Sequence, residues 1–183
     1  MFTNENNCDY FNELICRIRE DKEKGMEEFY NTYIKLIKSV AMSVCEDEYL
    51  ADVTCNTVLI KVWKNIYNND LYIRSPIGWL CKITKNASKD LLRANKKSRK
   101  NIVIDENLFA SKDQMQEIID YDEFTNHISH LKENEKIVVI KKVIGQEGFK
   151  EIAKFDHKPT STVSTIYYRA IGKVKEKLEK TKK

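Results

Sequence analysis

Apolar residues recur every three or four positions along most of the chain, a pattern that predicts amphipathic helices. We expect a short first helix over residues 11–18 and a longer second one after Gly25. A third helix should run from near Asp47 to just before Asn68, and a fourth should start at Pro76. Proline suits the first turn of a helix, because its missing amide proton has no partner there. These helices are predicted to pack into one bundle.

The apolar period fails from about residue 95 to 111 and then resumes. We expect a helix that ends at Gly145, a short helix over residues 149–155, a turn with Pro159 and a long helix over residues 160–180. The predicted fold class is therefore all-α, with two small helical domains. Their predicted bounds are 8–95 and 121–183, joined by a flexible linker over 96–120.

Residues 149–153, the turn that ends at Pro159 and residues 160–164 have the spacing of a helix-turn-helix. Ile152 and Ala153 are expected to pack on the second helix, where a small residue allows a close crossing. Recognition helices place short polar groups in the major groove. The face opposite the core carries such groups near the helix start, with an aromatic residue and an arginine one turn on: Ser161, Ser164, Thr165, Tyr168 and Arg169. A plain three-helix unit with a solvated polar face is the alternative.

Composition excludes several protein classes. With 42% apolar residues, 5 Gly and 2 Pro, a turn-rich β fold is disfavoured. No apolar run approaches the ~18–20 residues of a spanning helix, and the first residues lack a signal-peptide pattern. We expect a cytoplasmic protein without membrane insertion. The five cysteines form no CxxC pair and are interpreted as small buried hydrophobes.

Charge is distributed unevenly along the chain. Residues 82–100 contain eight basic residues and one acidic residue, residues 105–123 contain seven acidic and one basic, and residues 141–183 contain twelve basic and five acidic. This order suggests two modules that approach one polyanion while their connector avoids it. A solvated surface with many ion pairs is the alternative.

Four motifs within residues 11–180 together resemble the extracytoplasmic-function group of bacterial sigma factors. The third is the most specific, because its residues keep their spacing together. The motifs are Phe29-Tyr-x-x-Tyr33; Ala51 followed by Val58-Leu-x-x-Val-Trp63; Pro76-x-Gly-Trp-Leu-x-x-Ile-x-x-Asn86-x-x-x-Asp90-x-x-Arg93; and Glu151-Ile-Ala153 followed by Pro159, Thr162-Val163 and Arg169-Ala170.

The resemblance implies that the first domain reads and melts the minus-ten promoter element. A strand-opening site needs a pocket for an unstacked base, aromatic faces and cations along the backbone. Asn86 and the loop over residues 68–75 would read a flipped base, and basic residues at helical spacing would contact phosphates. Trp79 and Asp90 are interpreted as structural, a core ring and a local ion pair. The expected minus-ten residues are Tyr72, Arg74, Lys82, Lys85, Asn86, Lys89 and Arg93.

The resemblance also assigns a polymerase-binding helix and a minus-thirty-five reader. Val53 and Asn56 depart from the Asp and Gln usual in the family, Ser164 replaces a common basic residue, and Asp156-His157-Lys158 replaces an apolar-Gly-apolar turn. The clamp of core RNA polymerase would contact Asp52, Asn56, Leu59 and Trp63. The minus-thirty-five element would contact Thr160, Ser161, Ser164, Thr165, Tyr168 and Arg169.

The leading interpretation is a promoter-specificity subunit whose partners are core RNA polymerase (clamp and flap), promoter DNA and an anti-sigma factor. The alternative is a helix-turn-helix repressor or activator that does not bind polymerase through its N-terminal half. We expect no enzymatic activity, no cofactor and no metal, since His127 and His130 have no third ligand at suitable spacing and no glycine loop cradles a phosphate. The promoter sequence and whether the two domains pack together when free stay open.

Overall fold

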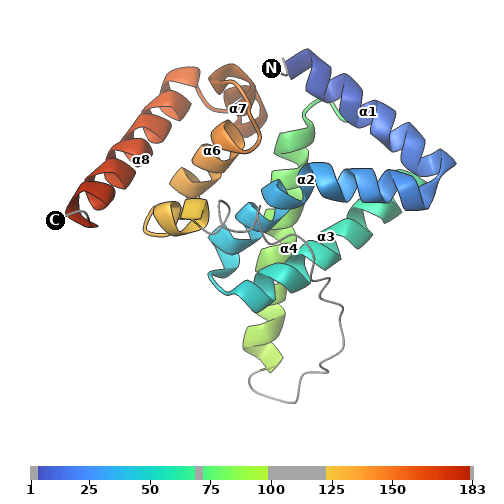
Figure 1. Ribbon diagram of the computed structural model, residues 1–183, viewed down its shortest axis with the longest axis horizontal. Coiled ribbons are helices and arrows are strands. Elements are labelled where there is room, and N and C mark those ends of the chain that lie inside the picture. Colours follow the sequence, from blue (N-terminus) through green and yellow to red (C-terminus); the bar gives the residue numbers. More distant parts are fainter. Residues whose placement is uncertain (1–3, 69–71, 99–122, 182–183) are drawn as a thin grey trace.

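The computed structural model describes residues 4–68, 72–98 and 123–181, and over these residues all regular structure is α-helical (Figure 1). The predicted all-α fold is confirmed. None of the helices in these ranges is long and apolar enough to cross a membrane. The helices are α1 (Asn4–Glu20), α2 (Lys22–Cys45), α3 (Glu48–Asn68), α4 (Pro76–Ser98), α6 (Glu133–Val143), α7 (Phe149–Asp156) and α8 (Thr160–Thr181).

The described residues fall into two regions on either side of residues 99–122. Residues 4–98 are called the first half, and residues 123–181 the second half. The predicted linker over 96–120 lies almost entirely outside the described residues, but α4 continues through Ser98, beyond the predicted boundary at residue 95. Residues 123–128 form one further helical stretch ahead of α6.

The junction between α1 and α2 differs from the sequence expectation. The second helix was expected after Gly25, but it begins at Lys22 because Asp21 caps it. The Asp21 carboxylate accepts hydrogen bonds from the amides of Glu23 and Lys24, both at 3.2 Å. These bonds satisfy amides that have no partner within the helix. The cap thus outweighs the poor helix propensity of Gly25, which lies buried in the first turn of α2.

A tight connection joins α2 to α3. Glu46 takes the left-handed conformation (φ 53°) and ends α2, and its amide donates to the carbonyl of Met42. The Asp47 carboxylate then accepts a hydrogen bond from the amide of Leu50 at 2.9 Å, as expected of an acidic residue at a helix start. The third helix ends at Asn68, one residue later than predicted.

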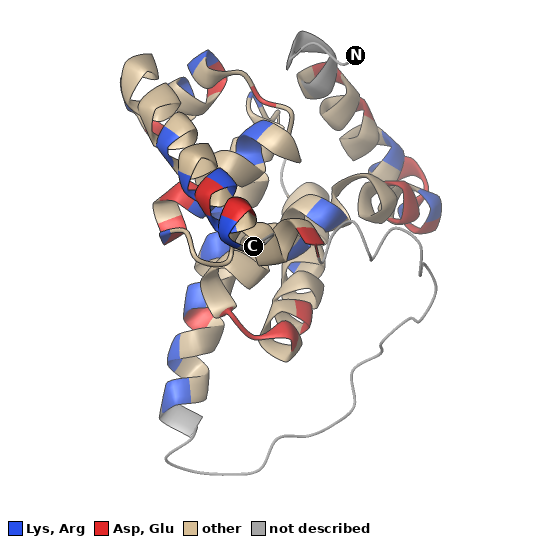
Figure 2. Ribbon diagram, turned by 60° about the vertical axis from the view of Figure 1, so that its left-hand side comes forward, with Lys and Arg blue, Asp and Glu red and all other residues tan. Residues whose placement is uncertain are grey.

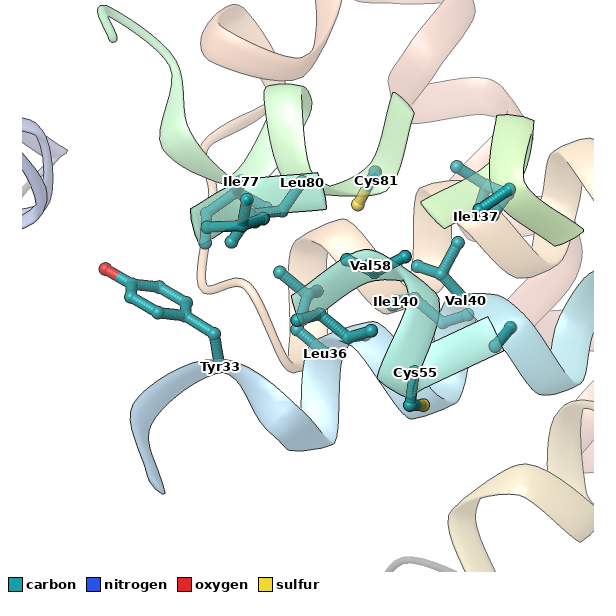
Figure 3. Close-up of a cluster of buried hydrophobic side chains, with 14 of the residues drawn as sticks. Tyr33, Leu36, Val40, Cys55, Val58, Ile77, Leu80, Cys81, Ile137 and Ile140 are labelled. Atoms are coloured by element: carbon teal, nitrogen blue, oxygen red, sulfur yellow. The ribbon is translucent and has the colours of Figure 1, made fainter. Parts of the chain in front are cut away.

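One hydrophobic cluster spans both halves of the chain. Val40, Val58 and Leu80 of the first half are fully buried, and Ile140 of α6 is buried in the same cluster. Figure 3 shows the α6 residues among side chains of α2, α3 and α4. In this structure the two halves therefore pack on each other.

A smaller cluster forms the core of the helix-turn-helix. It consists of Val138, Ile152, Ala153 and Val163, so Ile152 and Ala153 pack on the second helix as predicted. Glu135 of α6 ties this unit together by accepting two hydrogen bonds from Lys173 of α8, at 2.7 and 2.9 Å. Burial opposes ionisation of Glu135, but the hydrogen bonds from Lys173 and from the Lys132 amide lower its pKa overall.

The unusual turn Asp156-His157-Lys158 has a structural explanation. His157 adopts the left-handed conformation (φ 52°) that ends α7, and the Lys158 amide donates to the Ala153 carbonyl at 2.9 Å. Asp156 accepts a 2.6 Å hydrogen bond from Lys141, whose side chain is only 3% exposed. This ion pair connects the end of α7 to α6.

All five cysteines are free thiols. The interpretation as buried hydrophobes holds for Cys45, Cys55 and Cys81, but Cys8 is half-buried and Cys16 is exposed. Burial raises the pKa of both Cys55 and Cys81 to about 12. The thiols of Cys55 and Cys81 are therefore protonated at neutral pH.

Candidate nucleic-acid and polymerase interface

Helix α4 buries one side and presents a basic side. Leu80 and Ala87 are buried, and the half-buried ring of Trp79 packs edge-on against Phe11 at a centroid distance of 5.9 Å. This contact supports the interpretation of Trp79 as a core residue. Figure 2 shows Lys and Arg repeated along the end of α4 that projects from the bundle. The predicted residues Lys82, Lys85, Asn86, Lys89 and Arg93 lie on this side, because their spacing follows the helical repeat.

The cations of α4 differ in their partners. Lys82 and Arg93 are exposed, and Arg93 donates to Asp90 at 2.9 Å, the local ion pair that was expected. Lys85 and Lys89 are half-buried, because Glu133 of α6 lies 2.6 and 3.4 Å from their ammonium groups. The hydrogen bond from Lys85 is the main cause of a lowered pKa for Glu133. Sequence reasoning did not identify Glu133, which belongs to the other half.

The segment before α4 is held in place by α1. Asn12 donates from its amide nitrogen to the Ile73 carbonyl at 3.1 Å, and its amide oxygen accepts from the Ile73 amide at 2.9 Å. Ile73 is buried, so the neighbouring side chains Tyr72 and Arg74 are exposed. Asn12 was not predicted. The sequence gives only one indication of its role, a polar side chain next to the core residue Phe11. Residues 69–71 of the predicted loop lie outside the described residues.

Helix α3 is apolar on two sides. Its inner side is buried against the bundle through Val58, Val62 and Ile66. On the outer side, the predicted Asp52 is exposed and pairs with Lys38 at 3.1 Å, whereas Asn56, Leu59 and Trp63 are half-buried. This outer side also carries Tyr49, Ile60 and Tyr67, which are 55%, 50% and 75% exposed and were not predicted.

Trp63 and Tyr67, at the C-terminal end of this outer side, are held in place by contacts with neighbouring side chains. The ammonium of Lys22 lies 4.0 Å from the centroid of the Trp63 ring, a cation–π contact, and the rings of Trp63 and Tyr67 are 5.9 Å apart. Large apolar side chains at regular spacing on an exposed helix face are typical of a protein-docking surface. We call the six residues Tyr49, Val53, Asn56, Ile60, Trp63 and Tyr67 the α3 stripe.

Helix α8 presents the predicted polar face to solvent. Thr160, Ser161, Thr165, Tyr168 and Arg169 are exposed, and Ser164 is half-buried. The hydroxyls of Ser164 and Thr165 both donate to the Ser161 carbonyl, at 3.0 and 2.8 Å. They thus remain available as acceptors. The opposite side is buried through Val163 and Ala170, so the orientation of the helix matches the prediction.

The described residues contain no group of three or more His, Cys, Asp and Glu side chains that could hold a metal ion. His127 lies 3.9 Å from the Glu123 carboxylate on the same helical stretch.

Comparison with known proteins covers part of the sequence and nearly all of the fold. Residues 29–98 match the family model of Sigma-70 region 2, so the sequence match covers less than half of the chain. No curated protein matches the sequence significantly. Among solved structures, the chain is similar to CnrH in complex with the cytosolic domain of CnrY. The TM-score is 0.60 and the identity 15%, and the match covers 92% of this chain and 96% of that chain. At this identity the likeness shows a shared fold.

Proposed function

We propose that the chain is an extracytoplasmic-function sigma factor that binds core RNA polymerase in the cytoplasm and directs promoter-specific initiation, without turnover of its own. The observation that carries this proposal is the match of residues 29–98 to sigma-70 region 2. That segment contains the whole α3 stripe and the basic side of α4. A docking surface and a DNA surface thus lie on adjacent helices of one bundle.

The α3 stripe is the proposed contact with the polymerase clamp. Its exposed residues Tyr49, Ile60 and Tyr67 cost free energy in water that burial against a partner would recover. Asp52, Asn56, Leu59 and Trp63 lie on the same side and would add polar and apolar contacts. Aromatic residues in such positions commonly dominate the affinity of an interface. The second domain would contact the flap.

The basic side of α4 and the preceding segment are the proposed minus-ten site. Asn86 is exposed and offers an amide that can donate to and accept from a base edge. The exposed side chains Tyr72 and Arg74 supply an aromatic face and a cation beside it. Lys82, Lys85, Lys89 and Arg93 would follow the phosphates of the separated strand. Asn12 would act on this site indirectly by positioning Ile73.

Helix α8 is the proposed minus-thirty-five reader. The polar groups at its start, Thr160, Ser161 and Ser164, would meet base edges or phosphates in the major groove. Thr165, Tyr168 and Arg169 would extend the contact by one further turn. All but Ser164 are exposed, which leaves them accessible to a duplex.

A protein partner that regulates this factor is also proposed. CnrH, which shares the fold, is described in complex with the cytosolic domain of a second protein, CnrY. For this chain we infer an anti-sigma factor as the corresponding partner, as expected from the resemblance.

The proposal is tested by mixing the purified chain with bacterial core RNA polymerase. Co-elution in size-exclusion chromatography should be followed by run-off transcription from the promoter upstream of its own gene. Specific initiation that requires the added chain is the expected result. A chain that fails to bind polymerase but binds that duplex DNA directly would support the repressor or activator alternative instead.

A further inference from the structure

Two glycines allow the halves of the chain to approach closely. A Cβ atom on Gly78 of α4 would lie 2.5 Å from the ring Cγ of Phe155 in α7, and a Cβ on Gly145 would lie 2.6 Å from Cγ2 of Ile77 in α4. Each half thus supplies one glycine that receives an apolar side chain of the other. A larger residue at either glycine would collide with the other half, so both glycines are needed for the two halves to pack this closely.

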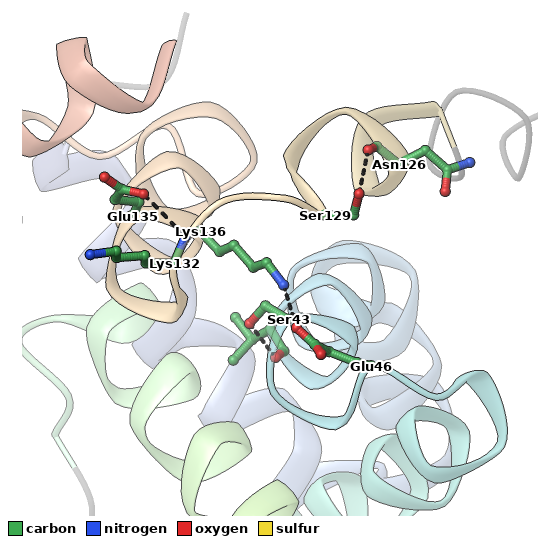
Figure 4. A network of polar contacts seen from close by, with 8 residues as sticks. Ser43, Glu46, Asn126, Ser129, Lys132, Glu135 and Lys136 are labelled. Carbon is green, nitrogen blue, oxygen red and sulfur yellow. Dashed lines mark hydrogen bonds and ion pairs between the residues drawn. The ribbon is translucent and has the colours of Figure 1, made fainter. Parts of the chain in front are cut away.

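Polar contacts surround this apolar fit. Lys136 of α6 reaches across to Glu46 at the end of α2 with a 2.8 Å ion pair (Figure 4). The Lys136 side chain is 5% exposed, although its partner is largely solvated. The Ser75 hydroxyl donates to the Glu147 carboxylate at 3.5 Å, a weak bond between the start of α4 and the segment before α7.

Cys81 of α4 lies close to the second half. Its side chain is buried (4% exposed), and Lys141, Glu147 and Asp156 of the second half lie close enough to affect its thiol electrostatically. The second half therefore covers the first turns of α4, and Cys81 should become accessible when the halves separate.

The same contact engages cations that the proposed function needs. Glu133 places one carboxylate oxygen 2.6 Å from Lys85 and 3.4 Å from Lys89. A carboxylate here offers these ammonium groups the same charge-assisted hydrogen bonds as a DNA phosphate. DNA at the minus-ten site would have to displace Glu133, whereas Tyr49, Ile60 and Tyr67 of the α3 stripe and all of the α8 polar face except Ser164 stay exposed.

We propose that α6 and α7 close over α4 and hold the free chain in an autoinhibited form in which Glu133 occupies Lys85 and Lys89. The inhibitory meaning of this contact rests on the proposed sigma-factor function. Partners that bind the α3 stripe or α8 can bind the closed form before the two halves separate. Opening then makes the minus-ten site available, so the free chain should bind single-stranded promoter DNA weakly.

The first measurement tests, in the absence of DNA, whether the two halves are in contact. In a background with Cys8→Ser and Cys16→Ser, the rate of Cys81 alkylation is measured by peptide mass spectrometry. We expect strong protection in the parent and faster labelling in Gly78→Ala, because the added methyl group collides with Phe155. Gly172→Ala is the matched control, since a Cβ there meets nothing within 4 Å.

The second measurement uses a fluorescent promoter oligonucleotide with a single-stranded minus-ten region. Glu133→Gln frees the two lysines without changing side-chain size, and it serves even if Gly78→Ala fails to fold. We expect both variants to bind about 5- to 10-fold more tightly than the parent, within the usual range of coupling between sites. Glu179→Gln, an equal charge change at an exposed position of α8, should leave the affinity unchanged.

The outcomes separate closure from function. Labelling of Cys81 in the parent as fast as in the urea-unfolded chain would overturn closure, whatever the DNA result. Unchanged affinity in Gly78→Ala and Glu133→Gln would overturn autoinhibition, provided Lys85→Gln in the opened chain weakens DNA binding. Protected Cys81 in a chain that never binds core polymerase would instead overturn the proposed function.

Discussion

Gly25 of α2 lies against the backbone of Ile18 in α1, and a Cβ atom at Gly25 would be 2.6 Å from the Ile18 Cα. Backbone atoms cannot yield as a flexible side chain can. The contact therefore sets how closely α1 approaches α2. Because α1 also carries Asn12, which holds Ile73, this approach affects the placement of the segment with Tyr72 and Arg74.

Gly25→Ala should destabilise the chain. Overpacking typically costs about 1–3 kcal/mol, only partly offset by the roughly 1 kcal/mol that alanine gains over glycine in a helix. Urea unfolding followed by circular dichroism measures the change. Gly172→Ala is the control and should be neutral or slightly stabilising; equal midpoints for the two variants would contradict the close packing at Gly25.

Ile60→Ser should weaken polymerase binding with little effect on folding. Ile60 is 50% exposed, so its removal costs little core energy, whereas an apolar anchor in an interface is worth about 1–2 kcal/mol or more. We expect roughly a 10-fold loss of affinity for core polymerase, measured by fluorescence anisotropy. Tyr30→Ser, at a 37% exposed position of α2, should retain affinity. Equal losses in both variants would argue against the α3 stripe as the docking surface.

Asn86→Ala should impair strand opening and leave polymerase binding intact. Loss of a bidentate base contact typically costs about 1–3 kcal/mol. Permanganate reactivity of unpaired thymines in the minus-ten region reports the opened fraction. Asn95→Ala makes the same change nine residues later, on the opposite side of α4, and should not alter it. If polymerase affinity falls as much as opening does, Asn86 does not have the role proposed for it.

The sequence predicts the features that depend on local geometry. Helix periods placed Lys82, Lys85, Lys89 and Arg93 on one side of α4, because residues three or four apart share a face. The polar face of α8 follows from the same rule. The predicted start of the second helix after Gly25 was wrong, because the prediction did not consider that Asp21 can cap a helix that begins at Lys22.

Features that depend on tertiary packing were not predictable. The hydrogen bonds between Asn12 and Ile73 join residues 61 positions apart, and the ion pairs of Glu133 cross from one half to the other. For α3, periodicity could not tell which of two apolar sides faces the bundle. Tyr49, Ile60 and Tyr67 were therefore found only from their exposure.

Glu147 should make folding stability depend on pH. It is 2% exposed, and burial raises its pKa to about 7, above the ordinary value of 4.5. Lys141 and Ser75 oppose this rise, whereas Glu151 and Asp156 add to it, and one carboxylate oxygen has no hydrogen-bond partner among the described residues. The folded chain therefore keeps a proton on Glu147 in a pH range where the unfolded chain has lost it.

The sign follows from this difference in proton binding. Stability contributed by protonated Glu147 is complete below about pH 4.5 and is lost as the pH rises through about 7. The loss is at most about 3 kcal/mol, from 1.36 kcal/mol per pKa unit. Glu147→Gln should remove this dependence and stabilise the chain relative to the parent at pH 8.5 but not at pH 4.5. Urea midpoints across this range provide the measurement, with the exposed Glu176→Gln as control; parallel profiles for parent and Glu147→Gln would show that Glu147 titrates as an ordinary carboxylate.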